Sequence, residues 1–257
     1  GVQRGLTWTA TWRRQRGGRG GEPDPARRAA VMADDDSGEA LNRRSYDRIV
    51  DAWDGARRRL SARELSWLEA LVHGLPTGAS VLDLGCGTGR PLAAWLMDRG
   101  YAVTGVDQSA ALLGRARHRF PDGHWIEAEF GTWLATEHGR SRFAATLCWD
   151  ALFHVERGRH GAILADARSL LPDGGRLLLT SGGSPGPAFT DTMFGERFFY
   201  DAHDPAATVA LLRSIGFRIR RQGWLDAPTT GRDKGRFAVL AERVAQATGA
   251  FRGEDLP

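Results

Sequence analysis

The pattern of hydrophobic and polar positions changes at Pro76. From about Leu41 to Leu75, apolar residues recur every three to four positions, which predicts two amphipathic helices. After Pro76, short apolar runs alternate with helical patterns. Strands are predicted at 81–84, at 102–106, around Trp125, and at 144–149, 176–180, 217–221 and 237–241. Helices are predicted at about 90–99, 109–119, 157–171 and 205–215.

Alternation of this kind predicts an α/β fold, in which a parallel sheet carries helices on both faces. The segment 182–204 interrupts it, because it shows little periodicity and carries the aromatic residues Phe198, Phe199 and Tyr200. Irregular segments of this length inside compact domains are usually functional. We expect a lid whose aromatic side chains contact a substrate, and the alternative is an insertion packed on the surface.

The composition is that of a folded globular protein, with 257 residues of which 42% are hydrophobic and 26% are charged. Apolar runs stay well short of the roughly 20 residues that cross a bilayer, so we expect a soluble protein with no membrane partner. Cys86 and Cys148 are too far apart for a CxxC site and too few for a disulfide framework, which favours the reducing cytoplasm. The histidines form no HxH or HExxH pairing, so no metal site is predicted.

The positive charge of the chain is concentrated at one end. Residues 1–31 contain seven Arg against two acids, a net of +5, whereas the remainder has 28 basic and 29 acidic residues, a net of −1. The folded part is therefore not basic, and contact with nucleic acid would have to come from the tail alone. We expect 1–40 to be a disordered tail rich in Arg and Gly, and 246–257 to be a second tail. Met32 looks like an alternative start, which would make 1–31 dispensable.

The strongest chemical signal is an apolar strand that runs into a glycine turn and then a helix, with the sequence VLDLGCGTGR at 81–90. Glycines let the backbone turn tightly and let a ligand lie against it, while the following helix offers unpaired N–H groups. A second signal is Asp107, which ends the next strand 22 residues after Gly85. A carboxylate in that position can accept both hydroxyls of a ribose. Together the two signals predict a nucleotide-like ligand.

Dinucleotide sites use G-x-G-x-x-G, whereas this turn is G-x-G-x-G preceded by an acid. At this point the chain resembles the class I S-adenosylmethionine-dependent methyltransferases, from about Tyr46 to Ala241. The resemblance implies a Rossmann-like, seven-stranded, mostly parallel sheet whose last strand is antiparallel, with S-adenosyl-L-methionine across the carboxyl ends of the first strands. It assigns 41–245 to the methyltransferase domain, with 41–75 as helices that cap the cofactor and 182–204 as the lid.

The resemblance also implies which residues bind the cofactor. Asp83 would hold the ammonium group, directly or through water, and Asp107 would take the ribose hydroxyls. Glu129 would meet the adenine amino group, and Glu127, two residues earlier, is the alternative. The implied cofactor-binding residues are Tyr46, Asp83, Gly85, Cys86, Gly87, Gly89, Asp107, Gln108, Glu129, Phe130 and Trp149.

After the fourth predicted strand, the segment CWDALFHV at 148–155 lies at the position of the family's fourth motif, beside the reacting methyl. It lacks the Pro-Pro of amino-modifying nucleic-acid methyltransferases and looks like the D-x-x-x-H element of small-molecule members. The resemblance implies that Asp150 stabilises the cationic cofactor. His154 would take a proton from an attacking hydroxyl or amine, and the alternative is a histidine with a structural role at a helix start.

In the helical segment before the glycine turn, Tyr46 would hydrogen-bond the cofactor carboxylate and Trp53 would form a wall of the pocket. The alternative is that both belong to the apolar stripe of an amphipathic helix. The expected substrate contacts are Trp53, Phe198, Phe199 and Tyr200.

These observations predict a cytoplasmic methyltransferase that acts on an oxygen or nitrogen of a small organic molecule. A nicotinamide-dependent oxidoreductase would share the sheet and Asp107, but it needs a Tyr-x-x-x-Lys pair, and the only lysine is Lys234. A non-catalytic cofactor-binding or RNA-associated protein of the same fold is the other alternative. It would keep the glycine turn and use the Arg-rich tail as its contact surface.

Overall fold

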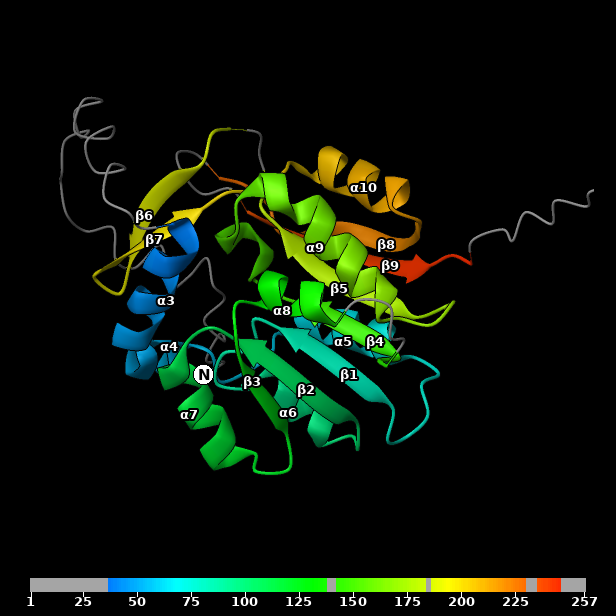
Figure 1. Ribbon diagram of the computed structural model, residues 1–257, viewed down its shortest axis with the longest axis horizontal. Coiled ribbons are helices and arrows are strands. Elements are labelled where there is room, and N and C mark those ends of the chain that lie inside the picture. Colours follow the sequence, from blue (N-terminus) through cyan, green and yellow to red (C-terminus); the bar gives the residue numbers. More distant parts are fainter. Residues whose placement is uncertain (1–36, 138–141, 184–185, 230–234, 246–257) are drawn as a thin grey trace, which may run out of the picture.

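The computed structural model describes residues 37–137, 142–183, 186–229 and 235–245 (Figure 1). The helices are α3 (Gly38–Arg48), α4 (Val50–Ala56), α5 (Ala62–Val72), α6 (Leu92–Met97), α7 (Ala110–Arg119), α8 (Phe130–Thr136), the 3-10 helix η1 (Leu152–His154), α9 (Arg157–Ser169) and α10 (Pro205–Ser214). The strands are β1 (Ser80–Leu84), β2 (Ala102–Asp107), β3 (His124–Glu127), β4 (Ala145–Cys148), β5 (Arg176–Ser181), β6 (Phe189–Met193), β7 (Glu196–Tyr200), β8 (Phe217–Asp226) and β9 (Arg236–Arg243).

Seven strands form one twisted sheet in the order β3-β2-β1-β4-β5-β9-β8. Strands β1 to β5 are parallel to one another, and β9 runs antiparallel to both of its neighbours. The predicted mostly parallel sheet with an antiparallel last strand is therefore confirmed. The register pairs Asp83 with Gly105 and Asp107 with Glu127, so β1, β2 and β3 end at the same edge of the sheet. A ligand at this edge can contact residues from all three strands.

Both faces of the sheet are covered by helices, as the α/β pattern predicts. Because side chains of a strand alternate, Leu82 and Leu84 pack with α8, α9 and α10, while Val81 packs with α5, α6 and α7 on the opposite face. These three side chains are at most 1% exposed. The two resulting cores hold the sheet rigid, which fixes the positions of the loops at its carboxyl edge.

A third, smaller core lies beside the sheet, where the N-terminal helices meet a two-stranded hairpin. We call α3, α4, η1 and the hairpin β6–β7 the cap. Figure 1 shows α3 in blue next to the hairpin in yellow, although the two segments are far apart in the sequence. The buried residues that hold the cap together are Ile49, Phe153, Met193, Phe198 and Tyr200.

The segment 182–204 differs from its predicted irregular form, because its centre is the antiparallel hairpin β6–β7. Phe194 and Gly195 connect the strands with φ of 51° and 84°. Two positive φ values are the geometry of the tight turns that suit hairpins, but Phe is an unusual residue for the first position. The sequence therefore lacked the Asn-Gly or Asp-Gly signal that marks such a turn.

Helix boundaries also differ from the sequence expectations. The first described helix, α3, begins at Gly38 with Ser37 as its N-cap, so it starts inside the segment expected to be a tail. Among the described residues, three helices rather than two precede β1, because the backbone breaks between α3 and α4 at Ile49 (φ −98°, ψ 12°). The apolar spacing continues across this break, which explains why periodicity did not reveal it. The short helix α8 was not predicted.

Most of the expected N-terminal tail, including Met32, and the segment 246–257 lie outside the described residues. Within the described ranges, no helix combines the length and the apolar character needed to traverse a bilayer.

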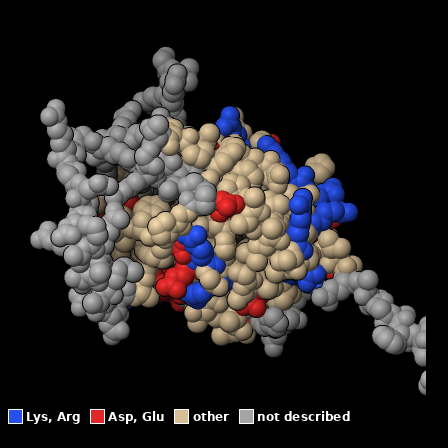
Figure 2. All heavy atoms as spheres, turned by 90° about the horizontal axis from the view of Figure 1, so that it is seen from above, with Lys and Arg blue, Asp and Glu red and all other residues tan. Residues whose placement is uncertain are grey.

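Seen from above, acidic and basic side chains adjoin each other in the middle of the face (Figure 2). On the edge strand β8, Arg218 and Arg220 both pair with Glu242.

Candidate active site

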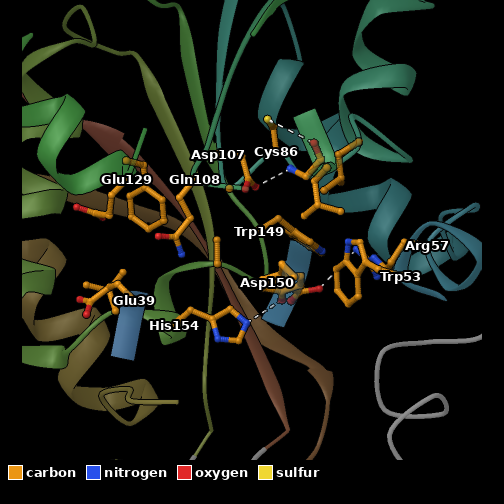
Figure 3. Close-up of a pocket in the computed structure, with 18 of the residues that line it drawn as sticks. Glu39, Trp53, Arg57, Cys86, Asp107, Gln108, Glu129, Trp149, Asp150 and His154 are labelled. Atoms are coloured by element: carbon orange, nitrogen blue, oxygen red, sulfur yellow. Dashed lines mark hydrogen bonds and ion pairs between the residues drawn. The ribbon is translucent and has the colours of Figure 1, made fainter. Parts of the chain in front are cut away.

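A pocket of about 760 Å³, including its mouth, lies at the carboxyl edge of the sheet beneath the cap (Figure 3). Its walls come from the turn after β1, the end of β2, the segment after β4, and helices α3, α4 and α8. The residues that line it are Glu39, Tyr46, Trp53, Arg57, Gly85, Cys86, Gly87, Arg90, Leu92, Asp107, Gln108, Leu112, Glu129, Phe130, Trp149, Asp150, Ala151, His154 and Val155.

The glycine turn brings the backbone against the segment after β4. Gly85 has a φ of 75°, and a Cβ added there would lie 2.4 Å from the Cβ of Ala151. Gly87 has a φ of 54° and also lines the pocket. Gly89 differs from the expectation, because it does not line the pocket and instead packs against Phe120 and Trp125. Its lack of a side chain serves the packing behind the turn.

Asp107 connects the end of β2 to the glycine turn. Its Oδ2 accepts a hydrogen bond from the Gly87 amide at 2.8 Å, and its Oδ1 accepts one from the Ser109 amide at 2.9 Å. Burial raises the pKa of this carboxyl to about 6, although the two amides act in the opposite direction. Carboxylate oxygens have further lone pairs, so Asp107 can still accept hydrogen bonds from a ligand. Gln108 follows it on the pocket wall.

Asp83 lies behind the turn, not on the pocket wall. The residue is 1% exposed, and its Oδ2 has no hydrogen-bond partner among the residues that the structure describes. Burial, and secondarily the charge of Asp107, raise its pKa to about 7. A buried carboxyl oxygen without a partner is costly, so this site favours a donor or a cation from outside the chain.

At the other end of the pocket, Glu129 caps α8, and its carboxylate accepts hydrogen bonds from the amides of Gly131 and Thr132. Arg159 donates to Glu129 at 2.8 Å and to Glu39 of α3 at 2.8 Å. Burial alone would raise the pKa of Glu129, but the bonds from Arg159 and Gly131 lower it overall. The carboxylate expected to meet the adenine is thus already bound by the protein.

Tyr46 and His154 meet on the wall of the pocket next to the cap. The Tyr46 hydroxyl lies 2.9 Å from Nε2 of His154, and Nδ1 of His154 lies 2.9 Å from the carbonyl oxygen of Phe199. A carbonyl oxygen can only accept, so Nδ1 carries the hydrogen and Nε2 of the neutral ring accepts from the Tyr46 hydroxyl. The surroundings therefore select one tautomer of His154. Tyr46, expected to bind the cofactor carboxylate, binds this imidazole instead.

Both members of this pair stay uncharged near neutral pH. Burial lowers the pKa of His154 to about 4, against the opposing influence of the Phe199 carbonyl and of Asp150. Burial also raises the pKa of Tyr46 well above its ordinary value. The uncharged imidazole therefore keeps on Nε2 the lone pair that accepts the hydrogen bond from the Tyr46 hydroxyl.

Arg57, at the end of α4, brings a cation to the pocket that the sequence analysis did not single out. Its guanidinium lies 3.5 Å from Oδ2 of Asp150 and 3.6 Å from Oε1 of Glu64. Arg236, which is 1% exposed, donates to Asp150 at 2.9 and 2.8 Å and to Glu64 at 3.0 Å. Asp226 binds the outer face of Arg236 at 3.1 Å. We call these five residues the buried ion cluster.

The cluster changes the expectation for Asp150. Both of its oxygens bind Arg236, so its negative charge is balanced inside the protein and not left for a cationic ligand. Its backbone has a φ of 54°, and its amide donates to Oγ1 of Thr180 at 2.7 Å. A left-handed conformation at a non-glycine residue has to be stabilised by its surroundings. Asp150 thus holds the chain direction between β4 and η1.

Trp149 and Cys86 occupy the middle of the pocket wall. The indole Nε1 of Trp149 is buried and has no hydrogen-bond acceptor in the described part of the chain. It offers a donor to a ligand in the pocket that Arg57 also lines (Figure 3). Cys86 and Cys148 are buried free thiols, so they form no disulfide.

The lid aromatics do not line the pocket. Phe198 is fully buried behind the pair, with its ring centroid 4.8 Å from that of Tyr46 and 5.9 Å from that of His154. Phe199 packs against Gly38 of α3, and Tyr200 lies 4.9 Å from His154 between ring centroids. They contact residues of the pocket wall and not the pocket itself. Trp53 does line the pocket, as expected.

Comparison with known proteins identifies a methyltransferase domain in this chain. Residues 81–175 match the family model of a methyltransferase domain. The chain is 31% identical over 189 residues to ubiquinone biosynthesis O-methyltransferase of Xanthomonas axonopodis pv. citri, a match that covers 66% of this chain and 77% of that one. It is 40% identical over 105 residues to trans-aconitate 2-methyltransferase of an Azoarcus species, covering 35% of this chain and 39% of the relative.

Among solved structures, the fold is similar to that of 1,6-didemethyltoxoflavin-N1-methyltransferase of Burkholderia thailandensis, with bound 1,6-didemethyltoxoflavin and S-adenosylhomocysteine. The TM-score is 0.60 at 21% identity, and the match covers 88% of this chain and 93% of that one. At this identity the likeness shows the shared fold.

The pocket fits S-adenosyl-L-methionine on its own geometry. It offers a carboxylate at the tip of β2, an indole N–H that lacks a partner within the described ranges, and a cation at one end, while the buried Asp83 lies behind the turn. The carboxylate matches the ribose hydroxyls of that cofactor, and the cation and the indole N–H match its carboxylate. With this pocket, this sheet order and these relatives, the chain belongs to the class I S-adenosylmethionine-dependent methyltransferases.

Proposed function

We propose that this enzyme methylates an oxygen or nitrogen atom of a small organic molecule, with Tyr46 and His154 accepting the proton that the acceptor loses. The observation that carries the proposal is the hydrogen bond between the Tyr46 hydroxyl and Nε2 of a neutral His154 on the pocket wall. The names of two similar proteins point the same way, since one is an O-methyltransferase of ubiquinone biosynthesis and the other an N1-methyltransferase.

In this proposal the two ends of the pocket bind different parts of the cofactor. Asp107 accepts the ribose hydroxyls, while Gln108 and Phe130 lie beside the adenine. Arg57 pairs with the carboxylate, assisted by the indole N–H of Trp149. When bound, the cofactor supplies a methyl group already activated by the positive charge of its sulfonium. The residues of the chain therefore have to align the acceptor, exclude water and remove a proton.

The Tyr46–His154 pair provides a route for that proton. An acceptor hydroxyl becomes strongly acidic as its oxygen gains the methyl group. The Tyr46 oxygen takes this proton while its own hydrogen moves along the existing hydrogen bond to Nε2 of His154. The resulting imidazolium keeps its Nδ1–H on the Phe199 carbonyl. A nitrogen acceptor would use the same route.

Replacement of His154 tests the proposal. His154→Ala is expected to lower kcat by about 10²- to 10⁴-fold, the usual contribution of a general base, and to leave the cofactor Kd within about threefold. His160→Ala is a matched control, because His160 is also buried with a lowered pKa of about 4 but does not line the pocket. Unchanged kcat in the His154 variant would remove the base from the mechanism.

The acceptor class has its own test. Full-length protein is incubated with methyl-labelled cofactor and either a small-metabolite extract or total RNA from the source cell. We expect label in a low-molecular-mass compound that is absent from the Tyr46→Phe reaction. Label in RNA alone would contradict the small-molecule proposal.

We also propose a cytoplasmic location, supported by the two buried free thiols, Cys86 and Cys148. Fractionation of cells that produce the tagged chain tests this location. Recovery of the chain in a secreted or envelope fraction would refute the cytoplasmic proposal.

A further inference from the structure

Asn42 lies at the centre of the cap, with 0% of its surface exposed. It is on α3, one helical turn before Tyr46, so one face of this helix carries both side chains. Its Nδ2 donates to the carbonyl oxygens of His154 at 3.2 Å and of Phe199 at 3.0 Å. Its Oδ1 accepts the Phe199 amide at 2.7 Å. One side-chain amide thus binds three backbone groups from two separate segments.

We propose that Asn42 is a positioning residue for the base: it holds the Phe199 carbonyl against Nδ1 of His154 and so fixes the tautomer whose Nε2 faces Tyr46. The inference rests on the proposed function, since it gives His154 the role of proton acceptor. Asn42 itself does not line the pocket.

The geometry makes Asn42 a spacer between the imidazole and its acceptor. The Phe199 carbonyl receives two donors, the Nδ1–H of His154 and one hydrogen of the Asn42 amide. The other hydrogen of the same amide binds the carbonyl of His154. The distance between the His154 backbone and the carbonyl that orients its ring is therefore set by one planar group. If that spacing relaxes, the Nδ1–H loses its fixed acceptor and the tautomer is no longer selected.

The hairpin explains why an amide is needed at this position. On β7, Phe199 is paired in register with Thr190 of β6, and its own amide and carbonyl bind Asn42 on the other side. A buried peptide group on an edge strand needs both a donor and an acceptor as partners. The Asn side chain supplies both a donor and an acceptor from one amide group, as the backbone of a neighbouring strand would. A carboxylate supplies only acceptors, and Ala supplies neither.

The position of Asn42 also links the base to closure of the cap. Glu39, Asn42 and Tyr46 follow one another at intervals of three and four residues along α3. Glu39 and Tyr46 line the pocket, while Asn42 holds the hairpin. Docking of this single helix therefore closes the pocket, orients His154 and supplies its hydrogen-bond partner at the same time.

Histidine ring ¹⁵N NMR on the full chain tests the proposal without any turnover. The His154 signal, assigned by its loss in His154→Ala, is expected to show the Nδ1–H tautomer in the parent protein. In Asn42→Ala it is expected to shift to a mixture of both tautomers. Asn42→Asp keeps the size and the acceptor for Phe199 but loses both donors, so it provides the same readout if the Ala variant does not fold.

Ser45→Ala is the matched control. Ser45 lies on the same helix and donates to the Arg197 carbonyl of the same hairpin at 2.6 Å, but it does not contact His154. It is expected to retain the parent tautomer. In the Asn42 variants, kcat is expected to fall about tenfold or more while the cofactor Kd stays within about threefold, since a misplaced base slows only the chemical step.

The outcomes separate this proposal from the one on which it rests. A parent-like His154 tautomer in both Asn42 variants would overturn the positioning role, as would an equal tautomer change in Ser45→Ala. A changed tautomer with unchanged kcat would uphold the positioning of the ring by Asn42 and overturn the base role of His154. A changed tautomer with reduced kcat and preserved cofactor affinity supports both.

Discussion

The two halves of the pocket are built in different ways. In the cofactor half, Gly87 and Asp107 are joined by a hydrogen bond between residues 20 positions apart in one strand-turn-helix-strand unit. In the cap half, the bond between Tyr46 and His154 spans 108 positions, and that between Asn42 and Phe199 spans 157. The first half is therefore set by local sequence, whereas the second exists only after three distant segments have packed together.

The halves also bury opposite kinds of titratable group. Asp83 and Asp107 are buried acids whose pKa values are raised to about 7 and about 6. His154 is a buried base whose pKa is lowered to about 4. Burial disfavours the charged form in each case, so the two halves respond to pH in opposite directions. In the proposed function the two halves also differ in role, since one half supplies hydrogen-bond acceptors for the cofactor and the other a proton acceptor.

Disruption of the buried ion cluster should affect both halves of the pocket at once, because the cluster supports both of them. Arg236→Met leaves Arg57 as the remaining cation that pairs with Asp150 and Glu64 in the described part of the chain, at 3.5 and 3.6 Å. Removing one partner of a buried ion pair typically costs about 3–5 kcal/mol of unfolding free energy. We expect a loss of this size in urea unfolding, together with weaker cofactor binding and lower kcat in the fraction that remains folded.

Arg218→Met is the matched control for this loss. Arg218 also pairs with a glutamate, Glu242, which lies on the same strand as Arg236, but 60% of the Arg218 side chain is exposed. Exposed pairs contribute little, so its variant should lose less than about 1 kcal/mol. Equal losses of unfolding free energy in Arg236→Met and Arg218→Met would show that the cluster does not join the halves.

Loss of the Asp107 carboxylate should affect the cofactor half alone. Asp107→Ala removes the proposed acceptor for the ribose and the bond that holds the Gly87 amide. Hydrogen bonds to charged groups are worth about 1.5–3 kcal/mol each, so we expect cofactor affinity to fall at least about 100-fold by calorimetry. The His154 tautomer should stay that of the parent protein.

Glu127 provides the control, because it ends the neighbouring strand in register with Asp107 but lies outside the pocket. Glu127→Gln should bind the cofactor as the parent does. Unchanged affinity in Asp107→Ala would remove the ribose role, and a large loss in Glu127→Gln would favour the alternative register considered from the sequence.

The same contrast explains how much the sequence could predict. The sheet, its antiparallel strand and most of the cofactor half followed from the glycine turn and Asp107, because their spacing lies within one supersecondary unit. His154 and Tyr46 were both singled out, but their contact was not. Spacing along the chain contains no information on a contact between residues 108 positions apart.

Other residues gave no sequence signal for their place in the site. Arg57 is the first of three consecutive arginines, and Arg236 stands in a strand that reads as apolar. Asn42 is one polar residue in a polar helix. Only burial distinguishes these side chains, with exposures of 7%, 1% and 0%. The hairpin was missed for a related reason, since the turn conformation of Phe194 is imposed by the strands that flank it.

The opposite titration of the two halves is the smallest effect we expect, and the most direct test of the contrast. For His154 the folded pKa of about 4 lies below the ordinary value of 6.5, so its neutral form contributes stability above pH 6.5 that is lost as the pH falls toward 4. For Asp107 the folded pKa of about 6 lies above the ordinary 3.8, so stability is lost as the pH rises through 6.

Amide hydrogen exchange at pH 7.0 and 5.0, corrected for the intrinsic rate, separates the two responses. On going to pH 5.0, the amides of β7 and η1 should lose protection, whereas those of β1 and β2 should keep or gain it. His154→Gln should remove most of the change in the cap without altering β1 and β2. A uniform response across both regions would mean that the halves are one cooperative unit, in which the buried acids and the buried histidine offset each other throughout the fold.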